Sequence, residues 1–299
     1  MAITLGIIGY GEVGAIFGRG LLAHTDIEAV WVWDLKFVDP VAGAAARAAA
    51  TADGMRVAAD LPALCAASDL TISAVTASST QSVAEEAALH ARAGARYLDL
   101  NSASPGTKQQ AGAALEAVGV SYIEAGVMTS VPPYGIRVPM LLGGPGAEAL
   151  AVMLCAWGMD ARVVSSTLGV ASAIKMSRSI MIKGLEALVV ESYTTARSFG
   201  VEEHVLPTLK ETFPQIDWDQ QGAYFFSRVA QHGKRRAEEL REAARTVIET
   251  GFEPLMATAI ASKQDWVAQQ ARAGVFEGLD AKSPWQAYAD RLIAQKRSS

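Results

Sequence analysis

A glycine-rich turn near the N-terminus constrains the fold of this chain more than any other feature of its sequence. The apolar run Leu5–Ile8 leads directly into a G-x-G-x-x-G motif at residues 9–14, and apolar residues at helical spacing follow the motif. A second apolar run, Ile27–Trp33, ends on Asp34, about twenty residues after the last glycine. Strand, glycine turn, helix, strand and acid in this order predict a dinucleotide-binding βαβ unit.

The three glycines of the motif have separate physical roles in such a unit. Gly9 permits the tight turn, Gly11 leaves room for a pyrophosphate beside the backbone, and Gly14 lets the helix pack closely on the strand. The unpaired N–H groups and the positive dipole end of the helix then face the phosphates. We predict that the cofactor is bound by this turn, by the end of the second strand and by two later loops, with contacts from Gly9, Tyr10, Gly11, Glu12, Val13, Gly14, Asp34, Lys36, Val75, Thr76 and Asn101.

The acid at the end of the second strand favours NAD over NADP. A carboxylate at this position accepts hydrogen bonds from the ribose hydroxyls and repels a 2′-phosphate, and Asp34 supplies it. Lys36 follows two residues later and has the length to reach a phosphate. We therefore predict NAD as the cofactor and keep NADP as the alternative.

The pattern of apolar runs divides the chain into two parts. The first part alternates short apolar runs with helical patterns, which is typical of a doubly wound, mostly parallel sheet. Ligands bind such sheets at the carboxyl ends of the strands, where the loops after Gly9, Thr76 and Asn101 lie. We predict an α/β Rossmann-type domain over residues 1–166 and an all-α domain over residues 167–299, with a long helix at about 169–199 and later helices at 202–213, 217–229, 233–250, 255–273 and 284–295.

Charge and cysteine content exclude several classes of protein. The formal net charge is −5 and no basic tract occurs, which argues against nucleic acid or an anionic membrane as the main partner. No apolar run reaches the ~18 residues of a membrane span, and the N-terminus lacks the basic start of a signal peptide. Cys65 and Cys155 lie far apart in apolar helical contexts, so we expect buried free thiols and a cytoplasmic location. The four histidines are scattered, and no metal site is predicted.

The predicted long helix carries polar groups near its start. Lys175 and Ser179 lie one helical turn apart on one face. Arg178 and Lys183 are close in sequence, and neighbouring positive charges lower the pKa of a lysine. A lysine tuned in this way exchanges a proton near neutral pH, as a general acid or base must. The alternative interpretation is a surface lysine whose ammonium group lies in solvent.

Four motifs, spread over nearly the whole chain, correspond to those of one known family. They are the turn at residues 9–14, the loop at residues 99–105, the segment at residues 124–128, and the pattern Gly169-x5-Lys175-x3-Ser179. They resemble the cofactor loop, the D-x-S-T-x-x-P loop, the D-A-P-V-S substrate loop and the G-x-x-x-x-x-K-x-x-N-N helix of the β-hydroxyacid dehydrogenase superfamily. This superfamily includes 3-hydroxyisobutyrate and 6-phosphogluconate dehydrogenases.

The resemblance implies hydride transfer between a nicotinamide cofactor and a small hydroxyacid or a related hydroxy or keto compound. It implies that Lys175 is the general acid and base, and that Ser102 and Ser179 hydrogen-bond the substrate. It also implies a carboxylate-bearing substrate and leaves its identity open. Candidate substrate-binding residues are Met128, Thr129, Ser130, Arg178 and His232.

The chain departs from the family pattern at two positions. Met128 stands where the family has the serine of its substrate loop, and Ser179 stands where it has an asparagine. The motif at residues 175–179 and the basic segment at residues 232–236 resemble a bacterial subgroup whose C-terminal domain has no known function. Mixed charges in that basic segment are typical of a solvated helix face. In the alternative interpretation, His232 or Arg235 holds a substrate carboxylate.

Two other functions share the predicted domain plan. Imine reductases resemble this chain in architecture, but they usually carry Asp or Tyr at the position of Lys175. A dinucleotide-sensing protein without catalysis is the second alternative. The helical domain has more apolar residues than a single core is expected to cover. We therefore predict a homodimer formed through that domain.

Overall fold

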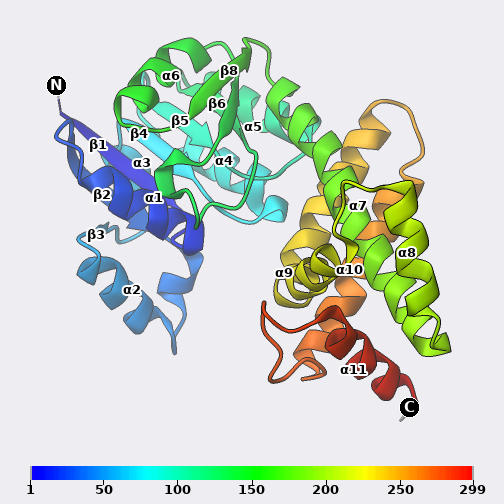
Figure 1. Cartoon of the computed structure of the whole chain (residues 1–299). Coiled ribbons are helices and arrows are strands. Elements are labelled where there is room, and N and C mark those ends of the chain that lie inside the picture. Colours follow the sequence, from blue (N-terminus) through cyan, green and yellow to red (C-terminus); the bar gives the residue numbers. More distant parts are fainter. Residues whose placement is uncertain (1, 298–299) are drawn as a thin grey trace. The chain divides into compact units, whose positions relative to one another are not determined.

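The computed structural model describes residues 2–297 and contains two compact units (Figure 1). One unit ends at Met176 and the other begins at Ser177. The division falls inside the long helix α7 (Val170–Phe199), whereas the sequence pattern places it at residue 166. The first turn of α7 is attached to the sheet of the first unit by hydrogen bonds to Glu124 of β6 (Ser121–Val127).

The first unit is built on one sheet with the order β3-β2-β1-β4-β5-β6-β7-β8. The β6–β7 pair is antiparallel and the other neighbouring strands are parallel, so the predicted α/β, doubly wound fold is confirmed. The strands are β1 (Ile3–Ile8), β2 (Ile27–Trp33), β3 (Arg56–Val57), β4 (Leu70–Ser73), β5 (Arg96–Asp99), β6 (Ser121–Val127), β7 (Met140–Gly143) and β8 (Ala161–Ser165).

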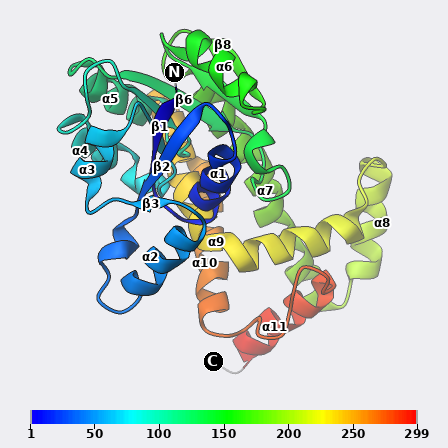
Figure 2. The ribbon, with the colours of Figure 1, turned by 90° about the vertical axis from the view of Figure 1, so that its left-hand side faces the viewer.

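Helices cover both faces of this sheet, and each face has its own core. Adjacent residues Ile7 and Ile8 of β1 belong to different apolar clusters, because successive side chains of a strand point to opposite faces. Helices α3 to α5 lie together on one side of the strands, and α1 and α6 lie on the other (Figure 2). The helices are α1 (Glu12–Leu22), α2 (Gly43–Ala52), α3 (Leu61–Ala67), α4 (Thr80–Ala88), α5 (Pro105–Glu116) and α6 (Ala147–Ala156), with 3-10 turns η1 (Leu35–Val38), η2 (Ala77–Ser79) and η3 (Gly135–Arg137).

The second unit is helical, as predicted. Its helices after α7 are α8 (Glu202–Thr212), α9 (Trp218–Glu249), α10 (Leu255–Arg272) and α11 (Trp285–Arg297). An aromatic core holds them together. Tyr193 of α7 contacts Trp285 edge-on, with 4.8 Å between the ring centroids, and Phe226 of α9 stacks on Trp285 with 6.3 Å between the centroids. Such ring pairs stabilise a core beyond the area that they bury.

The predicted break between helices at 217–229 and 233–250 is wrong, because α9 runs through residues 230–232 without interruption. A Cβ on Gly233 would lie 2.7 Å from the carbonyl oxygen of Gln264 on α10. The glycine therefore allows the backbones of α9 and α10 to approach closely, and it does not end a helix.

The expectation of two buried thiols is also wrong in part. Cys65 is buried on α3, whereas Cys155 is exposed on α6. Burial raises the pKa of the Cys65 thiol to about 12, so this group stays protonated near neutral pH. Among residues 2–297, no helix is long and apolar enough to cross a membrane.

Candidate active site

The glycine turn after β1 has the backbone geometry of a phosphate-binding loop. Gly9 has a φ of +90°, and a Cβ there would lie 2.5 Å from the carbonyl oxygen of Ala74. A Cβ on Gly14 would lie 2.0 Å from the carbonyl oxygen of Gly9, so α1 packs directly on the turn. A Cβ on Gly11 would meet no protein atom within 4 Å. No contact within the protein requires a glycine at residue 11, and the open space beside its backbone fits a pyrophosphate.

Asp34 is held in a fixed orientation beside this turn. Its Oδ2 accepts a hydrogen bond from the backbone N–H of Tyr10 at 2.6 Å, and its Oδ1 accepts one from the N–H of Lys36 at 2.8 Å. The Lys36 ammonium group lies 3.8 Å from Oδ2 and also donates to the carbonyl oxygen of Tyr10. A carboxylate has about four acceptor sites, so Asp34 retains acceptor sites for ribose hydroxyls.

The Tyr10 side chain connects the turn to Asp53, which follows α2. Its hydroxyl donates a hydrogen bond to Asp53 at 2.8 Å, and Arg19 forms an ion pair with the same carboxylate at 2.8 Å. Burial, reinforced by the hydrogen bond to Asp53, raises the pKa of Tyr10 above its ordinary value. Tyr10 is therefore a neutral anchor that links the turn to Asp53.

The remaining cofactor candidates lie at the same edge of the sheet. Glu12 and Val13 form the first turn of α1, at the positive end of its dipole. Val75 and Thr76 follow β4, which is the neighbour of β1 in the sheet. Asn101 follows β5, the next strand, and accepts a hydrogen bond from the N–H of Val75 at 2.7 Å. These loops therefore lie together at the carboxyl ends of adjacent parallel strands, where the sequence predicts the cofactor.

Asn101 owes its position to a buried network that the sequence analysis missed. The carboxylate of Asp99 pairs with the ammonium group of Lys108 at 2.8 Å and accepts a hydrogen bond from the Tyr122 hydroxyl at 2.6 Å. Asp99 also accepts from the N–H of Asn101, while the Asn101 amide donates to Ser73 at 2.9 Å. Because Asp99 and Lys108 are fully buried, this network fixes the loop that carries Ser102.

Ser102 is half-buried in the middle of that loop, between two anchored ends. The network above holds the start of the loop, and Ser104 caps α5 at its end by accepting a hydrogen bond from the N–H of Thr107. Met128, Thr129 and Ser130 begin the loop after β6, which is parallel to β5. The two predicted substrate loops therefore leave adjacent strands at the edge where the cofactor loops lie.

Glu124 of β6 attaches the start of α7 to this edge. Its Oε1 accepts hydrogen bonds from the N–H groups of Gly169 at 2.7 Å and Ala171 at 3.1 Å. Its Oε2 accepts from both the N–H and the hydroxyl of Ser172. The carboxylate is completely buried, and it satisfies N–H groups that the first turn of a helix leaves unpaired.

Lys175 lies on the second turn of the helix that Glu124 anchors. The residue is half-buried, and its Cβ lies 3.5 Å from the position that a Cβ on Gly126 would occupy. Gly126 is the penultimate residue of β6. The first unit thus brings the base of the Lys175 side chain to the carboxyl edge of the sheet, with the cofactor loops and the predicted substrate loops.

The other predicted residues belong to the second unit. Ser179 is buried and accepts a hydrogen bond from the Lys183 ammonium group at 3.2 Å, and Lys183 forms an ion pair with Glu239 at 2.7 Å. The positive charge of Lys183 is therefore balanced by a carboxylate that the sequence analysis did not consider. Arg178 is exposed, and His232 is half-buried on α9.

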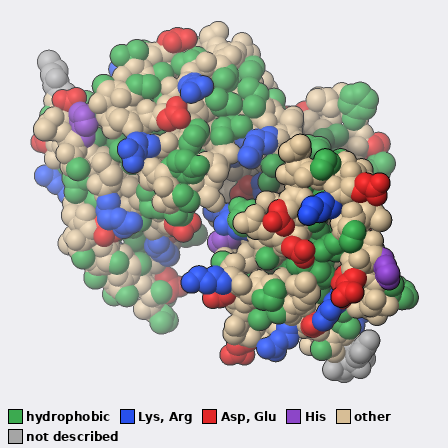
Figure 3. Space-filling model, in the orientation of Figure 1, with side chains coloured by type: hydrophobic (Ala, Val, Ile, Leu, Met, Phe, Trp, Pro, Cys, Tyr) green, Lys and Arg blue, Asp and Glu red, His purple; other side chains and the backbone are tan. Residues whose placement is uncertain are grey.

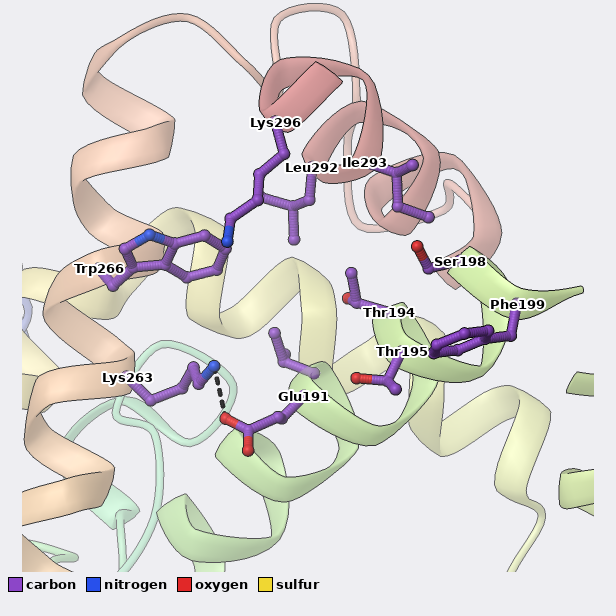
Figure 4. A pocket seen from close by; sticks show the side chains of 11 residues that line it. Glu191, Thr194, Thr195, Ser198, Phe199, Lys263, Trp266, Leu292, Ile293 and Lys296 are labelled. Atoms are coloured by element: carbon purple, nitrogen blue, oxygen red, sulfur yellow. Dashed lines mark ion pairs between the residues drawn. The ribbon is translucent and has the colours of Figure 1, made fainter. Parts of the chain in front are cut away.

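A groove of about 560 Å³ in the helical unit contains none of these predicted residues (Figure 4). Side chains of α7, α10 and α11 line it, and Lys263 pairs with Glu191 at 2.5 Å across one side. Lys263 also lies over the ring of Trp266. Because the groove contains none of the predicted site residues, we place the candidate chemistry at the sheet edge and not here.

Comparisons with known proteins agree with this architecture. Residues 4–135 match the NAD-binding domain of 6-phosphogluconate dehydrogenase, and residues 196–267 match a domain of unknown function, DUF1932. A conserved hypothetical protein from Sinorhizobium meliloti of known structure is 36% identical, with 99% of this chain and 97% of that chain covered and a TM-score of 0.76. The chain belongs to the family that combines these two domains.

More distant neighbours extend the resemblance. The conserved protein MTH1747, of unknown function and with structural similarity to 3-hydroxyacid dehydrogenases, is 29% identical over 91% of this chain and 98% of that chain, with a TM-score of 0.68. The 3-hydroxyisobutyrate dehydrogenase of Mycobacterium tuberculosis shares the fold at 17% identity, over 98% of this chain and 99% of that chain, with a TM-score of 0.71. The predicted resemblance to β-hydroxyacid dehydrogenases is therefore confirmed, with an NAD(P)-binding first domain.

A reductase of another class has the same fold. The reductive aminase of Aspergillus terreus, in complex with NADPH, is 21% identical, with 97% of this chain and 99% of that chain covered and a TM-score of 0.57. Among residues 2–297, no group of three or more His, Cys, Asp or Glu side chains is placed to hold a metal ion. The same fold thus occurs in a 3-hydroxyisobutyrate dehydrogenase and in a reductive aminase.

Proposed function

We propose that this protein is an NAD-dependent dehydrogenase that transfers a hydride between the cofactor and a small, carboxylate-bearing hydroxyacid, with Lys175 as general acid and base. The observation that carries the proposal is the position of Lys175 at the carboxyl edge of the sheet, beside Gly126. The same edge carries a glycine turn whose open space fits a pyrophosphate. An ionisable group beside a nicotinamide site is what alcohol oxidation needs.

The residues of the chain contribute orientation and proton transfer. The nicotinamide ring, when bound, accepts the hydride in oxidation and supplies it in reduction. The Lys175 amine takes the hydroxyl proton of the substrate during oxidation and returns it during reduction. As an ammonium group it also stabilises negative charge on the substrate oxygen. Ser102 and Ser179 are the proposed hydrogen-bonding partners of the substrate.

A turnover assay tests this proposal directly. The purified protein is incubated with NAD and a panel of small hydroxyacids, and NADH is followed by its absorbance. We expect oxidation of at least one hydroxyacid that carries a free carboxylate, and no oxidation of the matching ester. Reduction of cyclic imines with no activity on any hydroxyacid would favour the imine reductase alternative. Dinucleotide binding without turnover of either class would favour a sensing protein.

Asp34 leads to a prediction about cofactor choice. Since a carboxylate at the end of β2 would repel a 2′-phosphate, we expect NAD to bind more tightly than NADP by roughly tenfold or more. Asp34→Ser should remove most of this difference, while Asp26→Asn, an exposed acid before β2, should leave it unchanged. Calorimetric titration with both cofactors measures the ratio, and tighter binding of NADP to the unaltered protein would contradict the prediction.

The surface of the helical unit supports a homodimer. Among the apolar residues of this unit, Val189, Val190 and Phe226 lie in its own core. Met181 and Leu188, however, are 65% and 55% exposed on α7, and further hydrophobic side chains lie on the surface of this unit (Figure 3). Residues seven apart share a helix face, so these two form a stripe that a second copy can cover.

We expect light scattering to show a dimer at micromolar concentration. Leu188→Glu should shift the distribution to the monomer, because it places a charge in an apolar interface. Val152→Glu, at an exposed apolar residue of α6 in the first unit, is the matched control and should remain dimeric. A monomeric unaltered protein would contradict this assembly.

A further inference from the structure

A largely buried ion pair joins α7 to α9, both labelled in Figure 1, one helical turn beyond Ser179. The Lys183 ammonium group of α7 lies 2.7 Å from the carboxylate of Glu239 on α9, and 9% and 17% of the two side chains are exposed. The other carboxylate oxygen of Glu239 lies 3.9 Å from Arg235. Because a basic group stands at each of its oxygens, Glu239 is held in one orientation and in turn fixes the Lys183 ammonium group.

The Lys183 ammonium group directs a second hydrogen at Ser179. It donates to the Ser179 hydroxyl oxygen at 3.2 Å, and Ser179 is buried. An ammonium group donates hydrogen bonds and cannot accept them, so this bond occupies a lone pair of the hydroxyl oxygen and leaves the hydroxyl hydrogen. In the part of the chain that the structure describes, residues 2–297, this hydrogen has no protein acceptor. Ser179 therefore keeps one donor for a further group.

This donor lies close to the residue that we propose for proton transfer. Ser179 and Lys175 are four residues apart on the continuous helix α7, so they share a helix face. The family that the motifs resemble has an asparagine at this position, and an asparagine amide both donates and accepts. A serine oxygen that already accepts from an ammonium group is a stronger donor, because hydrogen bonds in a chain polarise one another. Lys183 thus prepares Ser179 for a hydrogen-bond acceptor.

We propose that Lys183 and Glu239 are positioning residues that make Ser179 the hydrogen-bond donor to the substrate carboxylate. The inference rests on the proposed function, because Lys175 must act on the hydroxyl of the same substrate molecule. A carboxylate only accepts hydrogen bonds, so it matches the remaining hydroxyl hydrogen. A group that only donates, such as an ammonium, is rejected at this position. Lys183 itself acts through Ser179 and does not touch the substrate.

Steady-state kinetics with the hydroxyacid that is oxidised fastest measure this role. Lys183→Met removes the ammonium group and keeps an unbranched side chain, so the Ser179 hydroxyl loses its fixed direction. We expect the KM for the hydroxyacid to rise roughly fivefold, as for the loss of one hydrogen bond, while kcat stays within about twofold. A bond to a group that does not react changes binding and not the chemical step. A fall in kcat at unchanged KM would overturn the assignment to the carboxylate.

A double-mutant cycle separates positioning from loss of packing. If Lys183 acts through Ser179, Lys183→Met should have no further effect on KM in the Ser179→Ala background. Lys263→Met is the matched control, because it removes another lysine of the helical unit that pairs with a carboxylate, Glu191 at 2.5 Å, and it should leave KM unchanged. An equal rise in KM from Lys183→Met in both backgrounds would overturn the proposal, since a purely structural effect does not need the hydroxyl group.

The positioning role and the proposed function fail in different ways. Turnover by the unaltered protein with no change of KM in Lys183→Met would refute the positioning role alone. Absence of hydroxyacid turnover by the unaltered protein would refute the proposed function, and this role with it. If Lys183→Met does not fold, Glu239→Gln takes its place in the cycle, because it keeps the shape of the side chain and weakens its hold on Lys183. The dissociation constant of NAD should be unchanged in every variant, since the glycine turn lies in the first unit.

Discussion

Lys175→Ala should remove turnover and leave cofactor binding intact. The proposed work of the side chain is proton transfer, which contributes typically ~10²–10⁴-fold in rate, and stabilisation of charge on the substrate oxygen adds to this. The residue lies on α7, whereas the pyrophosphate loop is the turn between β1 and α1. We therefore expect kcat to fall by at least two orders of magnitude while the dissociation constant of NAD is unchanged.

Two further variants separate proton transfer from packing at this position. Lys175→Arg should not restore activity, because a guanidinium group does not release its proton near neutral pH. Ser179→Ala should have a milder effect, since a neutral hydrogen bond contributes only ~0.5–1.5 kcal/mol. The kcat/KM for oxidation should rise with pH through an ionisation that Lys175→Ala abolishes. An alanine variant with most of the original kcat on the true substrate would refute the mechanism.

The sequence predicted those parts of the site whose signals lie in contiguous residues. The glycine turn, the strand after it and Asp34 follow one another within one βαβ unit, so their spacing alone defines the geometry. The long helix α7 was predicted with nearly its observed bounds, because no breaker interrupts it. Features of this kind are determined by neighbouring residues, so they can be predicted without knowing which distant residues they contact.

Other features were missed because their cause lies far away in the sequence. Gly233 was predicted to begin a helix, whereas it lies inside α9 and allows close approach to Gln264 of α10. Lys108 resembles a surface lysine, yet it is buried against Asp99. Glu124 offered one signal: it is the one charged residue of β6, and a buried charge needs partners. Its partners, at the start of α7, could not be inferred from the strand itself.

Glu124→Gln should weaken both stability and catalysis, because one carboxylate holds the start of the helix that carries Lys175. The substitution keeps the shape but removes the charge, and it turns one acceptor into a donor that faces the donors of α7. At least two hydrogen bonds to a charged group are lost, each worth ~1.5–3 kcal/mol, so we expect the free energy of unfolding to fall by about 3 kcal/mol. The value is measured by urea denaturation.

The catalytic effect distinguishes positioning from simple loss of stability. At a temperature where Glu124→Gln remains folded, kcat should fall at least tenfold, because a displacement of the first turns of α7 moves Lys175 relative to Gly126. The KM for NAD should stay unchanged, since the glycine turn is not touched. Glu148→Gln, at an exposed acid in the first turn of α6, is the matched control and should change neither quantity. If Glu124→Gln lowers stability but retains full kcat, the carboxylate serves the fold alone, and the position of Lys175 must be fixed by β6 and its packing against α7.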